Sequence, residues 1–120
     1  MLPRNQAYPL AEIIHALLDA LRAADFEPYG LDDFCLYGND EASLRLDAHY
    51  WLADYPQVDD DDNEHYPASV QAQGLDYLYS GEQFADVLIN AHGQKPTVNP
   101  EELVRALNHY SERDTFLDFE

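Results

Sequence analysis

Four consecutive aspartates, Asp59 to Asp62, carry the densest chemical functionality in this chain, and Glu64 follows them closely. Carboxylate oxygens are the ligands that Ca²⁺ prefers, so calcium binding is the first chemistry to consider. An EF-hand loop beginning at Asp59 would require glycine at its sixth position and a bidentate glutamate at its twelfth. Those positions hold Glu64 and Val70, so the spacing excludes this loop and leaves only weak, adventitious binding of divalent cations.

The residue types that support zinc binding or nucleophilic catalysis occur without the spacing that such sites need. The histidines are scattered along the chain: His15, His49, His65, His92 and His109. They form no i, i+4 pair on one expected helix, and the single cysteine, Cys35, cannot make a zinc–thiolate cluster. Cys35 lies in an apolar segment, which predicts a small buried core residue rather than an activated thiolate. Neither a glycine-rich phosphate loop nor a nucleophile elbow occurs, so we expect no enzyme activity, cofactor or metal.

The overall charge indicates what kind of partner suits this protein. Twenty-four acidic and six basic residues give a formal net charge of −18 on 120 residues. Between Ala23 and Gln94 there are sixteen acidic residues and one basic residue, Arg45. Such a field repels bare nucleic acid and anionic membrane surfaces, and it attracts cations. We therefore expect a cationic protein partner, with no direct binding to nucleic acid or membrane.

Tyrosines are interleaved with the acids, and Tyr55 and Tyr66 flank the acidic run. Tyrosine is enriched at interface hot spots, but a half-buried tyrosine with a solvated hydroxyl is an equally good interpretation of these two residues. For Tyr77 and Tyr79, which lie inside a predicted strand, we favour the half-buried ring with a solvated hydroxyl over a partner contact.

We expect the partner surface to consist of the acidic run, its neighbours and a second acidic edge nearer the N-terminus. The first group is Asp54, Tyr55, Asp59, Asp60, Asp61, Asp62, Glu64 and Tyr66, and the second is Asp32, Asp33, Asp40 and Glu41. For any single acid, a merely solvated surface position is at least as good an interpretation, because exposed charges usually contribute little.

The elements that position these residues are expected within a single domain, residues 1–120. Apolar residues at helical spacing predict an N-terminal helix over residues 9–24, with Pro9 at its first position. Residues 32–55 predict antiparallel strands, one at Phe34 to Tyr37 and one in which Leu44 to His49 alternate and continue through Ala53. Residues 38–42 connect these two strands, and residues 56–65 form an acidic loop.

The last part of the chain has strong local signals. Pro67 opens a short helix that Gly74 ends, and Leu75 to Tyr79 is a strand. Two C-terminal helices are predicted within residues 80–113, one capped by Ser80 and ended by Gly93, the other capped by Asn99. Residues 115–119 are a short strand or an extended packing arm.

These elements predict an α+β fold, with a small antiparallel sheet of three or four short strands and three main helices packed on one side. The N-terminus lacks the pattern of a signal peptide, no apolar run is long enough to span a bilayer, and one cysteine suits a reducing compartment. We therefore expect a cytoplasmic protein.

From Leu36 to Phe119 the chain resembles a family of small, acidic, uncharacterised bacterial proteins. The segments that carry the resemblance are Leu36-Tyr37, the strand around Trp51, the acidic run, Gly74 to Tyr77, Phe84 to Ala91, Gln94 to Pro96, Glu101 to Tyr110 and Asp114 to Leu117. Proteins of this kind are similar in size and charge to the immunity proteins of bacterial toxin systems. The resemblance implies a cytosolic antidote bound to a cognate toxin, and it implies no catalytic residues.

The leading hypothesis is therefore an immunity protein that binds and neutralises a cationic bacterial toxin, with a nuclease as the expected toxin class, because nucleases present Lys and Arg to phosphates. Three alternatives remain. The chain could be a nucleic-acid mimic from a mobile element that occupies a DNA-binding protein. It could be an acidic enzyme or metal-handling domain, or an acidic housekeeping domain without a docking face.

Overall fold

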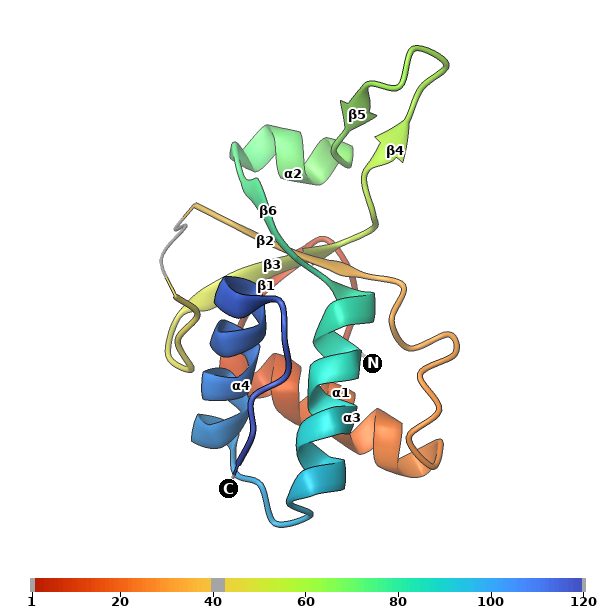
Figure 1. Cartoon of the computed structure of the whole chain (residues 1–120). Helices are drawn as coiled ribbons and strands as arrows, with labels where there is room; N and C mark the ends of the chain where they lie inside the picture. The colour runs from red at the N-terminus through yellow and green to blue at the C-terminus, as the bar shows by residue number, and fades with distance from the viewer. Residues whose placement is uncertain (1, 40–42, 120) are drawn as a thin grey trace.

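A four-stranded antiparallel sheet lies between a layer of three long helices and one short helix (Figure 1). The computed structural model describes residues 2–39 and 43–119. The strands of the main sheet, in spatial order, are β1 (Gln6–Pro9), β3 (His49–Ala53), β2 (Cys35–Gly38) and β6 (Asp76–Ser80). The helices are α1 (Leu10–Ala23), α2 (Ala68–Gln73), α3 (Gly81–Gln94) and α4 (Pro100–Arg113). This arrangement confirms the predicted α+β fold, with α1, α3 and α4 on one side of the sheet.

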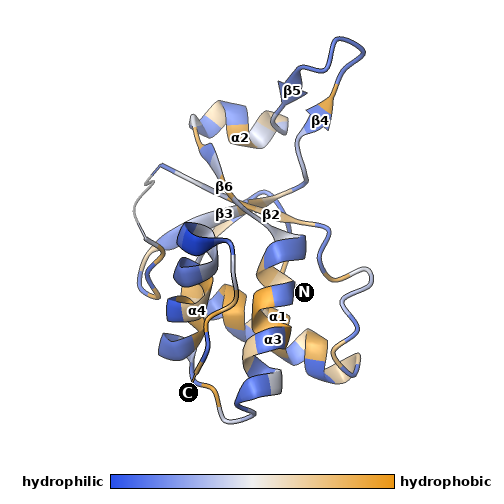
Figure 2. Cartoon of the chain, in the orientation of Figure 1, coloured by the Kyte–Doolittle hydropathy of each residue, from blue (hydrophilic) through white to orange (hydrophobic). Residues whose placement is uncertain are grey.

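The larger core lies between the sheet and the three long helices. Alternate strand residues point to opposite faces of a sheet, and Leu36, Leu52 and Tyr79 face this layer. The apolar stripe predicted for α1 is buried throughout: Leu10, Ile13, Ile14, Leu17, Leu18 and Leu21. Figure 2 shows hydrophobic segments, in orange, along α1 and α3 in the helical layer.

A smaller core occupies the opposite face of the sheet, where α2 covers it. Cys35, Tyr37 and Ala53 face this side and pack with Val70 of α2. Cys35 is fully buried, as predicted. Burial raises the pKa of the Cys35 thiol to about 11, so the thiol stays protonated and unreactive at neutral pH.

Both predicted helix caps are present. The Ser80 hydroxyl accepts the backbone N–H of Gln83 at 3.1 Å and so begins α3. Asn99 and Glu102 form a reciprocal capping box at the start of α4, with Pro100 in the first turn. The prediction that Gly93 ends α3 is wrong by one residue, because the helix continues through Gln94.

The predicted strand over Leu44 to Ala48 is wrong, because a side chain takes the place of a strand partner. The amide of Asn108 in α4 donates to the carbonyl of Leu44 at 3.0 Å and accepts the N–H of Leu44 at 2.8 Å. The carbonyls of Leu46 and Ala48 accept the first two N–H groups of α1. This segment therefore anchors α4 and caps α1, and β3 begins only at His49.

Residues 6–9 form β1, a strand that was not predicted from the sequence. This strand pairs with β3 in antiparallel register, from Gln6 with Leu52 to Pro9 with His49. Pro9 therefore ends a strand and precedes α1 instead of lying inside the helix.

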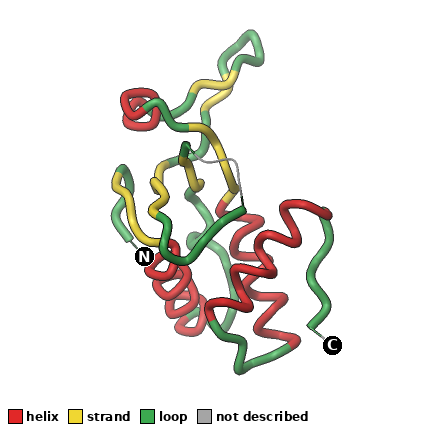
Figure 3. The backbone as a smooth tube through the Cα atoms, turned by 90° about the vertical axis from the view of Figure 1, so that its left-hand side faces the viewer, coloured by secondary structure: helices red, strands yellow, loops and turns green. Residues whose placement is uncertain are grey.

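The predicted acidic loop over residues 56–65 is a β-hairpin. Its strands are β4 (Gln57–Val58) and β5 (Glu64–His65), which pair antiparallel. Figures 1 and 3 show the hairpin projecting away from the helical layer, beyond the edge of the main sheet. The four consecutive aspartates lie at its tip.

The C-terminal residues 115–119 form an extended arm instead of a strand. The side chain of Gln94 donates to the carbonyl of Leu117 at 2.8 Å and accepts the N–H of Phe119 at 3.2 Å. Leu117 and Phe119 pack against the larger core. Among the described residues, no helix combines the length and the apolar content that crossing a bilayer requires.

Candidate functional site

Asp59 organises the tip of the hairpin. One carboxylate oxygen of Asp59 accepts the backbone N–H groups of Asp61 at 2.9 Å and Asn63 at 3.0 Å. The other pairs with Nε2 of His65 at 2.7 Å, and the backbone N–H of Asp59 donates to the carbonyl of Asn63. The hydrogen bond from His65 and the N–H of Asn63 lower the pKa of the Asp59 carboxyl, which therefore stays ionised. Asp59 thus has a structural role at the tip.

The other three aspartates of the tip are free to contact a partner. Asp60, Asp61 and Asp62 are exposed, and within the described residues their carboxylates make no hydrogen bond or ion pair. Asp62 adopts a left-handed conformation with φ of 64°, which aspartate tolerates better than most residues and which lets the chain reverse. Because the sequence has no Lys or Arg from residue 46 to residue 94, this negative charge lacks local compensation.

A shallow cleft lies at the base of the hairpin, and three tyrosine rings line it. We call it the tyrosine cleft, and its lining residues are Tyr55, Pro56, Glu64, Tyr66 and Tyr77. A neighbouring groove continues from it and includes Asp54, Gln57 and His65. The structure therefore places the predicted residues Asp54, Tyr55, Glu64 and Tyr66 together, at one end of the molecule.

Two of the cleft tyrosines, Tyr66 and Tyr77, pack on the buried ring of Tyr37, which lies outside the cleft lining. Tyr37 lies beneath the cleft, with ring centroids 5.6 Å from Tyr66 and 6.0 Å from Tyr77 in edge-on geometry. Tyr37 is itself fixed, because its hydroxyl donates to the carbonyl of Asp54 at 2.7 Å. The prediction of a half-buried ring with a solvated hydroxyl is wrong for Tyr79, which is 4% exposed and donates its hydroxyl to the carbonyl of Leu107 at 3.0 Å. Tyr77 is 39% exposed, because a register shift between Leu36 and Tyr37 of β2 turns Tyr77 away from the helical layer that Tyr79 faces, and β6 is an edge strand.

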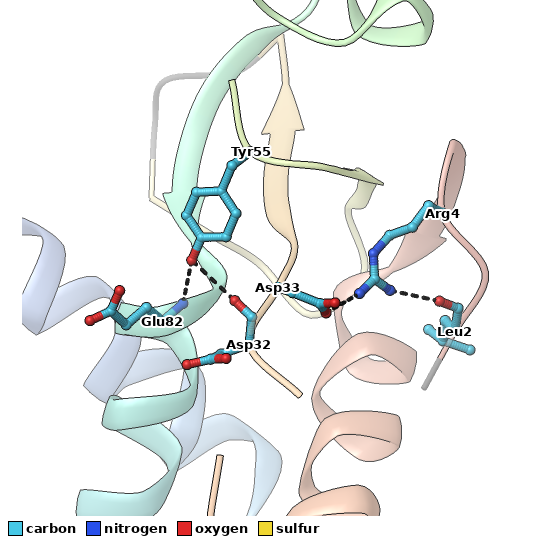
Figure 4. Close-up of polar contacts among 6 residues, drawn as sticks. All are labelled: Leu2, Arg4, Asp32, Asp33, Tyr55 and Glu82. Atoms are coloured by element: carbon cyan, nitrogen blue, oxygen red, sulfur yellow. Dashed lines mark hydrogen bonds and ion pairs between the residues drawn. The ribbon is translucent and has the colours of Figure 1, made fainter. Parts of the chain in front are cut away.

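The third cleft tyrosine, Tyr55, is held by its hydroxyl (Figure 4). The hydroxyl donates to the carbonyl of Asp32 at 3.1 Å and accepts the backbone N–H of Glu82 at 3.0 Å. Burial raises the pKa of the Tyr55 phenol, so the group stays protonated and able to donate. The ring of Tyr55 therefore keeps a fixed position while 37% of the residue is exposed.

The predicted second acidic edge is only partly available. Asp33 forms an ion pair with Arg4 at 2.7 Å, and Arg4 also donates to the carbonyl of Leu2 (Figure 4). The charge of Asp33 is therefore compensated, whereas the half-buried Asp32 has no such cation among the described residues. Asp40 and Glu41 lie outside the described residues.

Asp86 adds to this acidic edge and is not among the site residues predicted from the sequence. Burial raises the pKa of the Asp86 carboxyl, and the charges of Glu82 and Asp32 raise it further. The i, i+4 spacing of Glu82 and Asp86 on a predicted helix was the signal that could have identified the pair. Asp32, Glu82 and Asp86 thus form a negative cluster at the start of α3.

Within residues 2–39 and 43–119, no three side chains of His, Cys, Asp or Glu converge as metal ligands. The exposed apolar side chains Tyr55, Val58 and Tyr77 instead occur at the hairpin and the tyrosine cleft. Exposed apolar groups with a polar rim are typical of protein–protein contact surfaces. The arrangement can bind a partner by charge and by aromatic contact.

Comparison with known proteins gave one relationship. No curated protein and no solved structure matched the chain. Residues 14–119 match a family model described as a domain of unknown function, DUF7716. The match begins at residue 14 instead of Leu36, where the resemblance was expected to start, so it includes most of α1. Since the match covers most of its length, the chain belongs to the DUF7716 family.

Proposed function

We propose that this protein is an immunity protein, which binds a cognate cationic bacterial toxin and blocks it through the acidic hairpin and the tyrosine cleft. The observation that carries the proposal is the exposed tip of the hairpin. There, Asp60, Asp61 and Asp62 have no compensating partner among the described residues, and Asp59 fixes the loop that presents them. A nuclease is the expected toxin class, because its phosphate-binding surface carries Lys and Arg.

The charge of the hairpin has a physical use in such a complex. Adjacent carboxylates repel one another and do not stabilise the fold, because exposed charges contribute little. The same charges accelerate encounter with a cationic surface and add binding energy when ion pairs become desolvated. Proteins of similar size and charge that act as toxin antidotes give the proposal its second support.

A nucleic-acid mimic would use the same attraction toward a different partner. It would need carboxylates spaced like the phosphates of a duplex over an extended face. Asp60, Asp61 and Asp62, which have no compensating partner among the described residues, are instead consecutive at one hairpin tip. The immunity function is therefore the better supported of the two.

The test is capture of the partner from the native host at low and high salt, followed by its identification and an assay of its activity. We expect a basic toxin domain, bound at low salt, whose activity the protein inhibits. A variant with Asp60→Asn and Asp61→Asn should capture less of it. A matched control with Asp25→Asn and Glu27→Gln changes the net charge equally, but in the exposed turn after α1, at the far end from the hairpin (Figure 1).

Two results would overturn the proposal. One is capture of a DNA-binding protein from a restriction or repair system, which would favour the mimic. The other is a captured toxin whose activity is unchanged by saturating amounts of this protein.

A further inference from the structure

We propose that the tyrosine cleft receives an arginine side chain of the partner. The inference rests on the proposed function and specifies the chemistry of its contact. The cleft combines three tyrosine rings and one glutamate, Glu64, at the base of the charged hairpin. The rings and the carboxylate each attract a cation, and the rings can stack on a planar one.

The rings are arranged before any partner binds. Tyr66 and Tyr77 pack edge-on against the buried Tyr37, and the hydroxyl of Tyr55 is held between Asp32 and Glu82. Tyr55 and Tyr77 nevertheless remain 37% and 39% exposed. The faces of tyrosine rings attract cations, and rings that are already ordered lose little conformational entropy on binding.

The cleft also offers a negative charge that nothing else uses. Within the described residues, the Glu64 carboxylate makes no hydrogen bond or ion pair, and its residue is exposed. Asp54 extends the negative surface into the adjoining groove, where His65 is already paired with Asp59. An incoming cation can therefore pair with Glu64 without displacing an existing partner.

Arginine suits this geometry better than lysine does. Its guanidinium is planar, stacks on aromatic faces and presents several N–H donors to a carboxylate in a fixed fork. The cleft is open and shallow, so it admits the flat end of a side chain from a protein surface. A compact, strongly hydrated ammonium would gain less from the same rings.

The test uses small probes with the full chain, monitored by NMR of the tyrosine ring resonances. The probes are N-acetyl-arginine amide, its lysine counterpart and its citrulline counterpart, which keeps the shape of arginine without the charge. We expect saturable shifts of the Tyr55, Tyr66 and Tyr77 rings with the arginine probe and several-fold weaker binding of lysine. Citrulline should not saturate. Equal binding of citrulline and arginine would overturn the inference, because the cleft would then not recognise charge.

Variants locate the binding. Tyr77→Ala should weaken the arginine probe about fivefold, the effect of losing one cation–π contact, and Glu64→Gln should weaken it by a similar factor. Tyr29→Ala is the matched control, because Tyr29 is 96% exposed and is not among the residues that line the cleft. If Tyr77→Ala and Glu64→Gln bind the probe as the wild type does, the cleft is not the site.

The outcome separates this inference from the immunity function. The tip variant Asp60→Asn with Asp61→Asn should bind the arginine probe within about twofold of the wild type, because the tip is outside the cleft. Saturable arginine binding without any inhibited toxin would contradict the immunity proposal alone. Inhibition of a toxin that is insensitive to Tyr77→Ala and Glu64→Gln would contradict the cleft inference alone.

Discussion

The hydroxyl of Tyr55 accepts the backbone N–H of Glu82 at 3.0 Å, and so joins the base of the hairpin to the first turn of α3. The same hydroxyl donates to the carbonyl of Asp32. A residue at the start of the candidate site thereby caps one helix of the main core. This hydroxyl therefore joins the Tyr55 side of the tyrosine cleft to the first turn of α3.

Removing that atom should cost stability while leaving the ring in place. Tyr55→Phe leaves the N–H of Glu82 without its protein partner, and we expect a loss of about 1 kcal/mol in the free energy of unfolding. Urea denaturation measures it. Tyr29→Phe is the control, because Tyr29 is 96% exposed, and it should change nothing measurable. Equal midpoints for both variants would show that the Tyr55 hydroxyl does not hold the cleft.

A second prediction concerns the close approach at the start of α3. A Cβ atom added at Gly81 would lie 2.3 Å from the carbonyl oxygen of Phe34 and 2.7 Å from that of Asp32. Both are backbone atoms that cannot move aside, so Gly81→Ala should destabilise the fold by about 1–3 kcal/mol.

Gly93 in the same helix supplies the matched control. A Cβ there would meet nothing within 4 Å, so Gly93→Ala should stabilise the protein by about 0.5–1 kcal/mol through helix propensity. The two thermal midpoints should therefore move in opposite directions. A Gly81→Ala variant as stable as the wild type would contradict the described packing.

A third prediction is a pH dependence of the hairpin. The pKa of Asp59 is lowered from an ordinary 3.8, chiefly by the hydrogen bond from His65. The carboxyl of Asp59 therefore has a lower pKa in the folded protein than in the unfolded chain. Ionised Asp59 stabilises the folded hairpin fully above the unfolded pKa, and this stabilisation is lost as pH falls through the folded pKa. The amide proton shifts of Asp61 and Asn63, which donate to this carboxylate, should move together with a midpoint below 3.8.

Asp59→Asn should abolish this shared transition, whereas Asp60→Asn should retain it. A midpoint at or above the ordinary aspartate value in the wild type would show that the carboxylate is not held as described. Independent transitions of the two amides would show the same.

A fourth prediction tests the anchor that replaced an expected strand. Asn108→Ala leaves both backbone groups of Leu44 without their partner in a partly buried setting, so we expect a loss of about 1–3 kcal/mol. Asn90→Ala, which removes one exposed hydrogen bond to Gln94, should cost less than about 0.5 kcal/mol. Denaturant unfolding compares them, and equal losses would contradict the anchoring role of Asn108.

Elements with strong local signals could be predicted from the sequence. The caps at Ser80 and Asn99, the left-handed stop at Gly74 and the apolar stripe of α1 depend on residues close in the chain. The segment from Leu44 to Ala48 has the alternation of a strand, but Asn108 in the distant α4 satisfies the backbone of Leu44. The β-propensity of a segment does not indicate such a long-range contact.

In the candidate site, too, local features could be predicted and long-range contacts could not. The acidic residues of the site could be predicted from the sequence, but the hairpin could not. Its tip depends on the carboxylate of Asp59, which accepts the backbone N–H groups two and four residues later, and the sequence does not indicate which of the four aspartates plays this role. Tyr77 and Tyr79 share a strand yet differ in exposure, because a register shift opposite them in β2, a strand distant in sequence, turns them toward different sides of the sheet. The exposure of these two tyrosines depends on tertiary contacts, which a short stretch of sequence does not show.

The central claim is that the hairpin tip is the docking face for a cationic toxin. The most direct test is to measure the association rate of the captured toxin domain by stopped flow over a range of salt concentrations. Three proteins are compared: the wild type, the tip variant Asp60→Asn with Asp61→Asn, and the control Asp25→Asn with Glu27→Gln. We predict a several-fold slower rate and a flatter salt dependence for the tip variant alone, because steering charges were removed from the contact surface. Identical rates and salt slopes for the two double variants would contradict the claim.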